Sequence, residues 1–270
     1  GMIGVRLEMF GLVFTGPKTI IHNITKCVEK AGLSVAETVI TSLALTESTL
    51  SDGEKDFGTI VIDMGGGQTT TAVMHDKQLK FTHVDQEGGE FVTKDISIVL
   101  NTSFNNAEAL KINYGDAYPS RTSADEDFPV DVIGKSEPVK VDERYLAEII
   151  EARLEQIFRK AKDALDEIEA LDLPGGVVLT GGAASLPGVV DLAEDIFGTT
   201  VKLHVPNQMG LRNPVFTNVI SIVNYSAELS DVYHLAKSAV TGEKVPLSTS
   251  PQTSAVSNTP VYDDYEATND

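Results

Sequence analysis

The sequence predicts an α/β protein, and three observations support this fold class. Three strand-like segments, 58–63, 69–74 and 79–84, follow one another with only short turns between them. An apolar run at 177–179 leads through a glycine pair into a helical pattern, as expected of a buried strand followed by a helix. Apolar residues between 146 and 168 recur at helical spacing. Strands and helices therefore share one chain, which favours a sheet covered by helices.

The amino-terminal part predicts two strand–helix pairs. Residues 5–14 are apolar and extended in character, and a helical pattern follows them, with Gly32 as its C-terminal cap. A short strand at 38–40 precedes a helix that runs to about Leu50, and the polar segment 51–53 closes this part.

Beyond the three-stranded meander, the pattern changes to helices and a loop. We expect a helix from about residue 89 and a second one at 105–112. Residues 115–129 are rich in Asp, Ser, Pro and Gly, which is typical of a loop. Short alternating strands are expected behind it, at 130–133 and 139–141.

The carboxy-terminal half is dominated by one long helix. Asp142 is its expected N-terminal cap, because an aspartate side chain accepts a hydrogen bond from the first free amides of a helix. After the strand at 177–179, a helix ends at Gly198, and a strand at 201–203 and a final helix at 217–225 complete the predicted fold.

Composition excludes several classes of function. The 270 residues include 40 acidic and 21 basic side chains, a net charge of −19, so binding to nucleic acid is not expected. Cys27 is the single cysteine, which excludes an intramolecular disulfide, and on an apolar helix stripe it is better explained as a core residue than as a reactive thiol. The five histidines lack metal-site spacing, and no apolar run reaches the roughly 18 residues needed to span a bilayer. We expect a protein of the reducing cytoplasm.

The candidate phosphate site is a glycine-rich hairpin between two strands. Glycines let backbone N–H groups approach phosphate oxygens, and Asp63 at the strand end can reach Mg²⁺ through water. The hydroxyl groups of Thr69 and Thr70 add possible donors. Taken alone, the motif is equally well explained as an ordinary hairpin turn. The candidate cofactor-binding residues here are Asp63, Gly65, Gly66, Gly67, Gln68 and Thr69.

Two further motifs support a nucleotide site. Gly181, Gly182 and Ala183 follow a buried strand and precede a helix, the position where ligands sit in α/β sheets, and bare backbone there can lie against a nucleoside. Glu108 and Lys111 lie three apart on one helical face, where they can bond ribose hydroxyls and flank a base. A surface ion pair is the competing explanation for that pair.

Taken in order, these motifs resemble the actin-like ATPase superfamily. In that superfamily the hairpin is the second phosphate loop, and the segment 177–185 is the adenosine loop. The chain is most similar to the FtsA family of bacterial cell division, and the resemblance covers residues 4 to about 236. The segments that carry it are Gly4-Val5-Arg6-Leu7-Glu8, Lys26-Cys27-Val28-Glu29-Lys30-Ala31-Gly32-Leu33, Gly89-Glu90-Phe91-Val92-Thr93-Lys94-Asp95-Ile96 and Ile149-Ile150-Glu151-Ala152-Arg153.

The resemblance implies a lobe of the actin-like ATPase type, with a ribonuclease-H-like core and a small inserted α+β subdomain. It also implies an excised carboxy-terminal fragment, since the first phosphate loop expected near the amino terminus of such a protein is absent. The implied parts are a remnant of a family-specific subdomain at 1–35, the end of the first actin-like subdomain at 36–56, the core at 57–100 and 172–236, the inserted unit at 101–171, and a disordered linker tail at 237–270.

In function, the resemblance implies a filament-forming adaptor. Such a protein binds ATP with Mg²⁺, polymerises, holds the tubulin-like FtsZ at the cytoplasmic face of the membrane at the division site, and recruits later septum-building proteins. Many relatives carry an acid just after the hairpin glycines, whereas this chain has Gln68, so at most slow ATP hydrolysis is expected and no catalytic residue is assigned. The family's membrane anchor is a carboxy-terminal amphipathic helix, and residues 241–270 show no such stripe.

The inserted unit is expected to bind the carboxy-terminal tail of FtsZ, with Arg153 as a charged anchor. Arg153 interrupts the apolar row through Leu146, Ile150 and Ile157, and no acid lies three or four residues from it on the helix. An unpaired arginine in such a place suits a bidentate contact with a peptide carboxylate.

Two other classes in the same superfamily remain as alternatives. A heat-shock chaperone requires a β-rich peptide-binding domain after the ATPase core, and the polar tail cannot form one. A sugar kinase requires a catalytic acid at a sugar pocket, and no such constellation is identifiable.

Overall fold

A computed structural model describes residues 11–229 and residue 233. The chain divides into two units, and residues 16–228 form the folded unit that carries every element named below. The strand expected at 5–14 lies partly outside the described residues, and its described end, 11–14, has no regular structure. The tail predicted at 237–270 lies outside them entirely.

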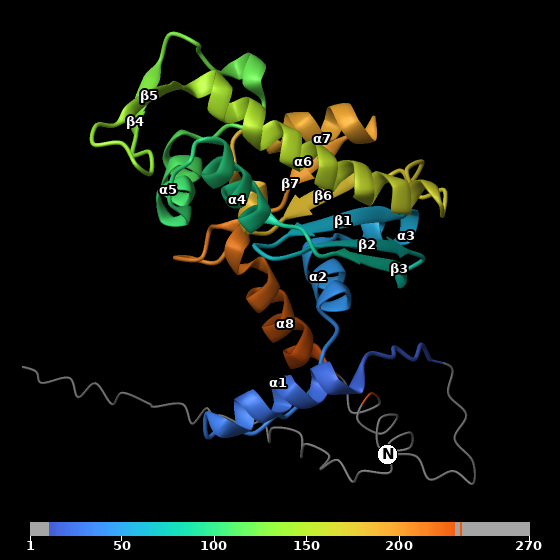
Figure 1. The fold of residues 1–270 in the computed structure, drawn as a ribbon. Coiled ribbons are helices and arrows are strands. Elements are labelled where there is room, and N and C mark those ends of the chain that lie inside the picture. Colours follow the sequence, from blue (N-terminus) through green and yellow to red (C-terminus); the bar gives the residue numbers. More distant parts are fainter. Residues whose placement is uncertain (1–10, 230–232, 234–270) are drawn as a thin grey trace, which may run out of the picture. The chain divides into compact units, whose positions relative to one another are not determined.

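A five-stranded sheet with the order β3-β2-β1-β6-β7 forms the centre of this unit (Figure 1). The antiparallel meander β1–β3 confirms the sequence prediction, and β6 and β7 join it as parallel strands. Parallel pairing places Asp63 of β1 opposite Thr180 of β6, so the carboxyl ends of both strands meet at one edge. The strands are β1 (Thr59–Met64), β2 (Thr69–His75), β3 (Gln78–Asp85), β6 (Val177–Thr180) and β7 (Val201–Leu203).

Four helices pack together on one side of the sheet: α6 and α7 contact its strands, and α6 also packs against α4 and α5. Ile60 and Ile62 of β1 face this side and join its core with Leu154 of α6. Asp142 accepts a hydrogen bond from the backbone N–H of Tyr145, which confirms the predicted cap. The four are α4 (Gly89–Val99), α5 (Phe104–Tyr114), α6 (Glu143–Asp166) and α7 (Val189–Phe197).

The opposite face of the sheet is covered by α2 (Thr41–Thr49), which packs against α8 (Thr217–Glu228). Val61 lies between Ile60 and Ile62 in sequence and points to this second face, where it packs with Leu45 of α2. Both faces of β1 are therefore buried, and the strand reads as a continuous apolar run up to Asp63.

The amino-terminal elements differ from prediction in three ways. Helix α1 (Lys18–Lys30) forms, but none of its residues is buried and Cys27 is exposed, because no described segment covers its apolar stripe. The strand expected at 38–40 is absent from the described structure, since a strand requires a pairing partner and this segment has none there. Of the residues expected to close this part, Ser51 is the N-cap of a helix and Asp52 and Gly53 begin it: α3 (Asp52–Phe57) was not predicted.

The inserted unit contains a two-stranded ribbon, β4 (Asp127–Val130) and β5 (Val139–Asp142). The first strand was expected at 130–133, three residues too late. Phe128 and Val130 are both buried, and Phe128 stacks on Tyr114 with ring centroids 4.4 Å apart, so burial sets the start of the strand. Three short 3₁₀ turns, η1 (Pro119–Arg121), η2 (Gly182–Ser185) and η3 (Pro214–Phe216), lie in the connections.

Across the residues described, no helix is both long enough and apolar enough to cross a bilayer.

Candidate functional site

The hairpin between β1 and β2 exposes backbone amides at its tip. Gly65 N–H closes the turn by donating to the carbonyl of Gln68 at 3.0 Å. The carbonyls of Gly65 and Gly66 accept from the amides of Gly89 and Glu90, at 2.9 and 2.8 Å, which ties the hairpin to the first turn of α4. Gly66 and Gly67 are exposed, and in the described structure their own amides donate no hydrogen bond. Such free successive amides form an anion-binding surface.

Asp63 lies beneath this hairpin, one residue before the end of β1, and is only 7% exposed. Its Oδ2 accepts from Asn218 Nδ2 of α8 at 2.6 Å, whereas its Oδ1 is buried without a partner. Burial raises the pKa of Asp63, and the hydrogen bond from Asn218 works against that rise. An unpartnered buried carboxylate oxygen at this place fits a hydrated divalent cation.

Gly181 packs directly against Asp63. Its φ is +92°, and a Cβ there would lie 2.5 Å from both Asp63 Oδ1 and the carbonyl oxygen of Met64. Only glycine adopts this positive φ without strain and leaves room for the two oxygens. At Gly182 the same Cβ would touch Val215 at an ordinary 3.5 Å, so the steric requirement for glycine is at Gly181.

Lys111 and Glu108 form an ion pair, but not the surface pair that was the competing explanation. Lys111 is buried, and its Nζ donates to Glu108 Oε2 at 2.7 Å, to Thr93 Oγ1 at 2.7 Å and to the carbonyl of Gly89 at 3.1 Å. Burial disfavours the charged form of Glu108, yet hydrogen bonds from Lys111 and Thr93 outweigh it and lower the pKa of Glu108. The Glu108 side chain is 39% exposed and can still accept from a ligand.

The predicted motifs converge in space through a segment that the sequence analysis treated only as a helix start, Gly88-Gly89. A Cβ on Gly88 would lie 2.5 Å from the carbonyl oxygens of Gly65 and Gly66. A Cβ on Gly89 would lie 3.1 Å from Ala183 Cβ and 3.8 Å from Lys111 Nζ. The hairpin, the pair at 108–111 and the segment 181–183 therefore surround one glycine pair.

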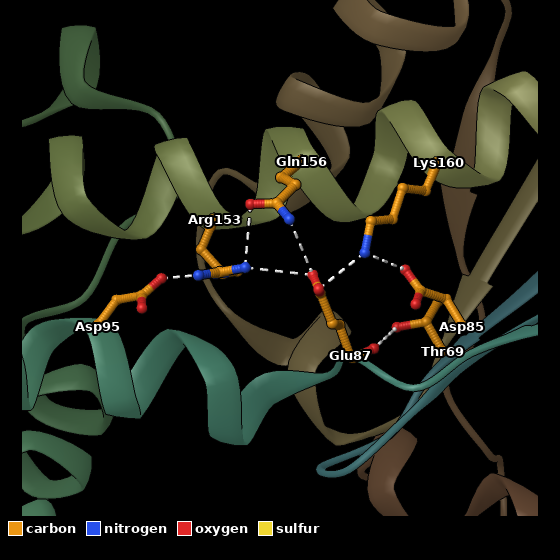
Figure 2. A network of polar contacts seen from close by, with 7 residues as sticks. All are labelled: Thr69, Asp85, Glu87, Asp95, Arg153, Gln156 and Lys160. Carbon is orange, nitrogen blue, oxygen red and sulfur yellow. Dashed lines mark hydrogen bonds and ion pairs between the residues drawn. The ribbon is translucent and has the colours of Figure 1, made fainter.

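Thr69 does not offer its hydroxyl proton to this surface. Its Oγ1 donates to the main-chain carbonyl of Glu87 at 2.8 Å (Figure 2). The carboxylate of Glu87 accepts from three side chains of α6: Lys160 at 2.7 Å, Arg153 at 3.2 Å and Gln156 at 3.3 Å. The hairpin is thus connected to α6 through Glu87, and Lys160 also forms an ion pair with Asp85 of β3, which lies opposite Thr69.

Arg153 has acidic partners outside its own helix, which helical spacing within α6 does not reveal. Its Nε donates to Asp95 Oδ2 of α4 at 2.5 Å, its Nη1 contacts Glu87, and its guanidinium lies 5.8 Å from the ring centre of Phe91. The hydrogen bond that Arg153 donates to Asp95 raises the pKa of Arg153, and the side chain is only 18% exposed. The premise that Arg153 is unpaired was wrong.

A hollow of about 330 Å³ lies between α4 and α6, beside the Arg153–Asp95 pair. Four of its lining residues are apolar and two are acidic. Its lining residues are Asp95, Ile98, Val99, Glu148, Ile149 and Ala152.

Comparison with known proteins assigns the family. The model of the family described as "Cell division protein FtsA" matches residues 60–221. The chain belongs to the FtsA family. This favours the division family over the kinase and chaperone alternatives.

The curated FtsA relatives include close and distant sequences. The FtsA of Enterococcus hirae is 85% identical over 245 residues, which are 91% of this chain and 55% of the relative. That of Enterococcus faecalis is 77% identical over 265 residues, 98% of this chain and 60% of the relative. That of Bacillus subtilis is 43% identical over 225 residues, 83% and 51% of the two chains. The FtsA-family chain therefore spans about half to three fifths of these relatives' length.

Solved structures confirm the actin-like ATPase fold of this FtsA-family chain. MreB5 of Spiroplasma citri bound to ADP matches with a TM-score of 0.62 at 14% identity, covering 84% of this chain and 69% of MreB5. The MamK double helical filament matches with a TM-score of 0.58 at 14% identity, covering 80% and 66%. At such identities the likeness concerns the fold alone.

Proposed function

We propose that this FtsA-family chain is part of an ATP-binding actin-like protein that polymerises, links the FtsZ ring to the cytoplasmic face of the membrane at the division site, and recruits septum-building proteins. The observation that carries the nucleotide step is the buried, unpartnered Oδ1 of Asp63 between the glycine hairpin and Gly181. Membership of the division family supports the cellular role.

In the proposed nucleotide complex, the free amides of Gly66 and Gly67 bind phosphate oxygens. Asp63 holds Mg²⁺ through water, and the cation neutralises phosphate charge next to that carboxylate. The backbone at 181–183 lies against the nucleoside, and Glu108 accepts from ribose hydroxyls while Lys111 holds Glu108 in place.

ATP acts in this proposal as a conformational ligand that favours the polymerising state, with at most slow hydrolysis. MamK, which has the same fold, forms a double helical filament, so this fold is compatible with polymerisation.

We further propose that the tail of FtsZ binds at the hollow between α6 of the inserted unit and α4 of the core. Ile98 lines the hollow and is 66% exposed, so an apolar side chain of the tail that packs on it would bury apolar surface and favour binding. Arg153 anchors the tail by exchanging Asp95 for a carboxylate of the peptide.

Co-sedimentation of the full-length protein with FtsZ polymers tests the adaptor function. We expect the protein to pellet with FtsZ in the presence of Mg-ATP, and its retention in the supernatant would contradict the link. For the tail site, Ile98→Ser should weaken binding of a labelled FtsZ tail peptide in fluorescence anisotropy. Ile112→Ser is the matched control, since Ile112 is 69% exposed in the inserted unit but does not line the hollow.

A further inference from the structure

We infer that Glu87 is the positioning residue of the phosphate hairpin, and that it works by locking the hairpin to α6. This inference rests on the proposed nucleotide function, since it names the residue that holds the binding surface in place.

The main chain around Glu87 forms hydrogen bonds with both sides of the hairpin, at the start of β2 and at Gly65 and Gly66. The Glu87 carbonyl accepts from the hydroxyl of Thr69, the first residue of β2, at 2.8 Å. Immediately after Glu87, the amides of Gly89 and Glu90 bond the carbonyls of Gly65 and Gly66. The contact at Gly88 is so close that a Cβ would collide with the hairpin backbone at 2.5 Å. A shift of this segment therefore shifts the hairpin.

The side chain of Glu87 connects that segment to α6 (Figure 2). Its carboxylate, 17% exposed, accepts from Arg153, Gln156 and Lys160, which are spaced three and four residues apart and so share one face of the helix. The hydrogen bond from Lys160 is the main reason that the pKa of Glu87 is lowered, which keeps the acceptor ionised.

Helix α6 is a firm support for this contact. Leu146, Ile150, Leu154 and Phe158 are fully buried in the main core, so the helix is held along its length. The hairpin tip, in contrast, is exposed and makes no internal hydrogen bond through the amides of Gly66 and Gly67. Anion binding requires those amides in one geometry, so loss of the Glu87 contact acts on ligand affinity more than on folding.

The first test is Mg-ATP affinity of the full-length protein by calorimetry. Glu87→Gln keeps the shape but loses the charge, and should weaken binding about tenfold, which equals about 1.4 kcal/mol, with little change in Tm. Glu155→Gln is the matched control: it removes a charge from an α6 ion pair with Arg159 that does not reach the hairpin, and affinity should be unchanged. Equal affinity of the Glu87→Gln and parent proteins would overturn the inference.

A double-mutant cycle then tests whether Glu87 and Lys160 act on Mg-ATP affinity through their contact with each other or independently. Lys160→Met removes the shortest of the three contacts from the α6 side together with the ion pair between Lys160 and Asp85, and it serves on its own if Glu87→Gln does not fold. If Glu87 and Lys160 act as one unit, the double variant loses less affinity than the sum of the two single losses. Strictly additive losses would exclude the lock.

A ligand-free readout distinguishes failure of this inference from failure of the proposed function. In ¹H–¹⁵N spectra of the 270-residue chain, Glu87→Gln should shift the amide signals of Gly66 and Gly67, and Glu155→Gln should not. Unshifted amides would overturn the inference whatever the nucleotide result. Shifted amides, with a parent protein that does not bind Mg-ATP, would support the lock and reject the nucleotide function.

Discussion

Asp63 has an ionisable side chain that is almost completely buried. One carboxylate oxygen accepts a hydrogen bond from Asn218, and the other has no hydrogen-bond partner among the described residues. Burial of this kind is costly for folding unless a ligand compensates it, which is typical of functional sites. The same residue is therefore expected to show opposite effects on stability and on ligand binding.

Asp63→Asn should increase stability at neutral pH by about 1 kcal/mol in the absence of ligand, because it removes a poorly solvated charge. The pKa of Asp63 is raised in the folded state, so its contribution to stability is full below the usual Asp pKa and is lost as the pH rises through the folded value. The gain in Tm should thus be present at pH 7 and vanish in acid. The same variant should lose Mg²⁺-dependent ATP binding in the full-length protein, and unchanged nucleotide affinity would refute the role of Asp63.

Gly181→Ala should destabilise the chain by about 2 to 4 kcal/mol in urea unfolding. The new Cβ would meet Asp63 Oδ1 and the Met64 carbonyl at 2.5 Å, and alanine is strained at a φ of +92°. Gly182→Ala is the neighbouring control, with ordinary contact to Val215 and an expected loss below about 1 kcal/mol. Equal losses at the two positions would show that the close approach at Gly181 is relaxed in solution.

At the scale of elements, α3 shows how a short helix is held at its first turn. Ser51 and Glu54 form a capping box, in which the Glu54 carboxylate accepts from the Ser51 amide and hydroxyl, each at 2.8 Å. Lys202 of β7 also pairs with Glu54, so the cap joins α3 to the far strand of the sheet. The Ser-x-x-Glu pattern was present in the sequence and is the signal that predicts this helix.

Glu54→Gln should therefore destabilise the chain by about 1 kcal/mol at neutral pH, the size of a lost helix cap. Burial raises the pKa of Glu54, but the hydrogen bonds that its carboxylate accepts from Lys202 and Ser51 outweigh this effect and lower the pKa to about 2. Its contribution is present above the usual Glu pKa and is lost as the pH falls toward 2, so parent and variant should converge there in thermal unfolding. Asp52→Asn in the same turn is the control, since in the described part of the chain no hydrogen bond to Ser51 or Lys202 is found for Asp52. A difference in stability between Glu54→Gln and the parent that does not change with pH would contradict the role of the Glu54 carboxylate in the cap.

At the scale of the whole molecule, the described residues place the hairpin, the pair at 108–111 and the segment 181–183 around one glycine pair. The chain spans only 55% and 60% of its two Enterococcus relatives, and the resemblance places the first phosphate loop in the part that it does not cover. Several ligand contacts of the full-length protein are thus expected outside this chain.

We predict that the 270-residue chain binds Mg-ATP at least about a hundredfold more weakly than the full-length protein, since two lost contacts of about 1.4 kcal/mol each account for that factor. Calorimetry on both proteins under identical conditions measures the difference. Equal affinity would mean that the residues present here form the complete site.

Features that depend on residues close in the chain follow from the sequence alone. The meander β1–β3 and the long helix α6 follow from apolar periodicity, and the cap at Asp142 from one side chain and an amide three residues on. The sequence also singled out the glycine pair 181–182, since a strand, the pair and a helix adjoin, but as a place for a ligand and not for the close contact of Gly181 with Asp63.

The pairing of polar side chains, in contrast, depends on how distant parts of the chain pack together. Arg153 pairs with Asp95 and Glu87, 58 and 66 positions away, and Asn218 reaches Asp63 across 155 positions. Periodicity and capping report on residues within about one helical turn, so they carry no information on such partners. The burial of Lys111 and the lock at Glu87 were likewise set by how α4, α5 and α6 pack, which brings remote segments into hydrogen-bonding distance.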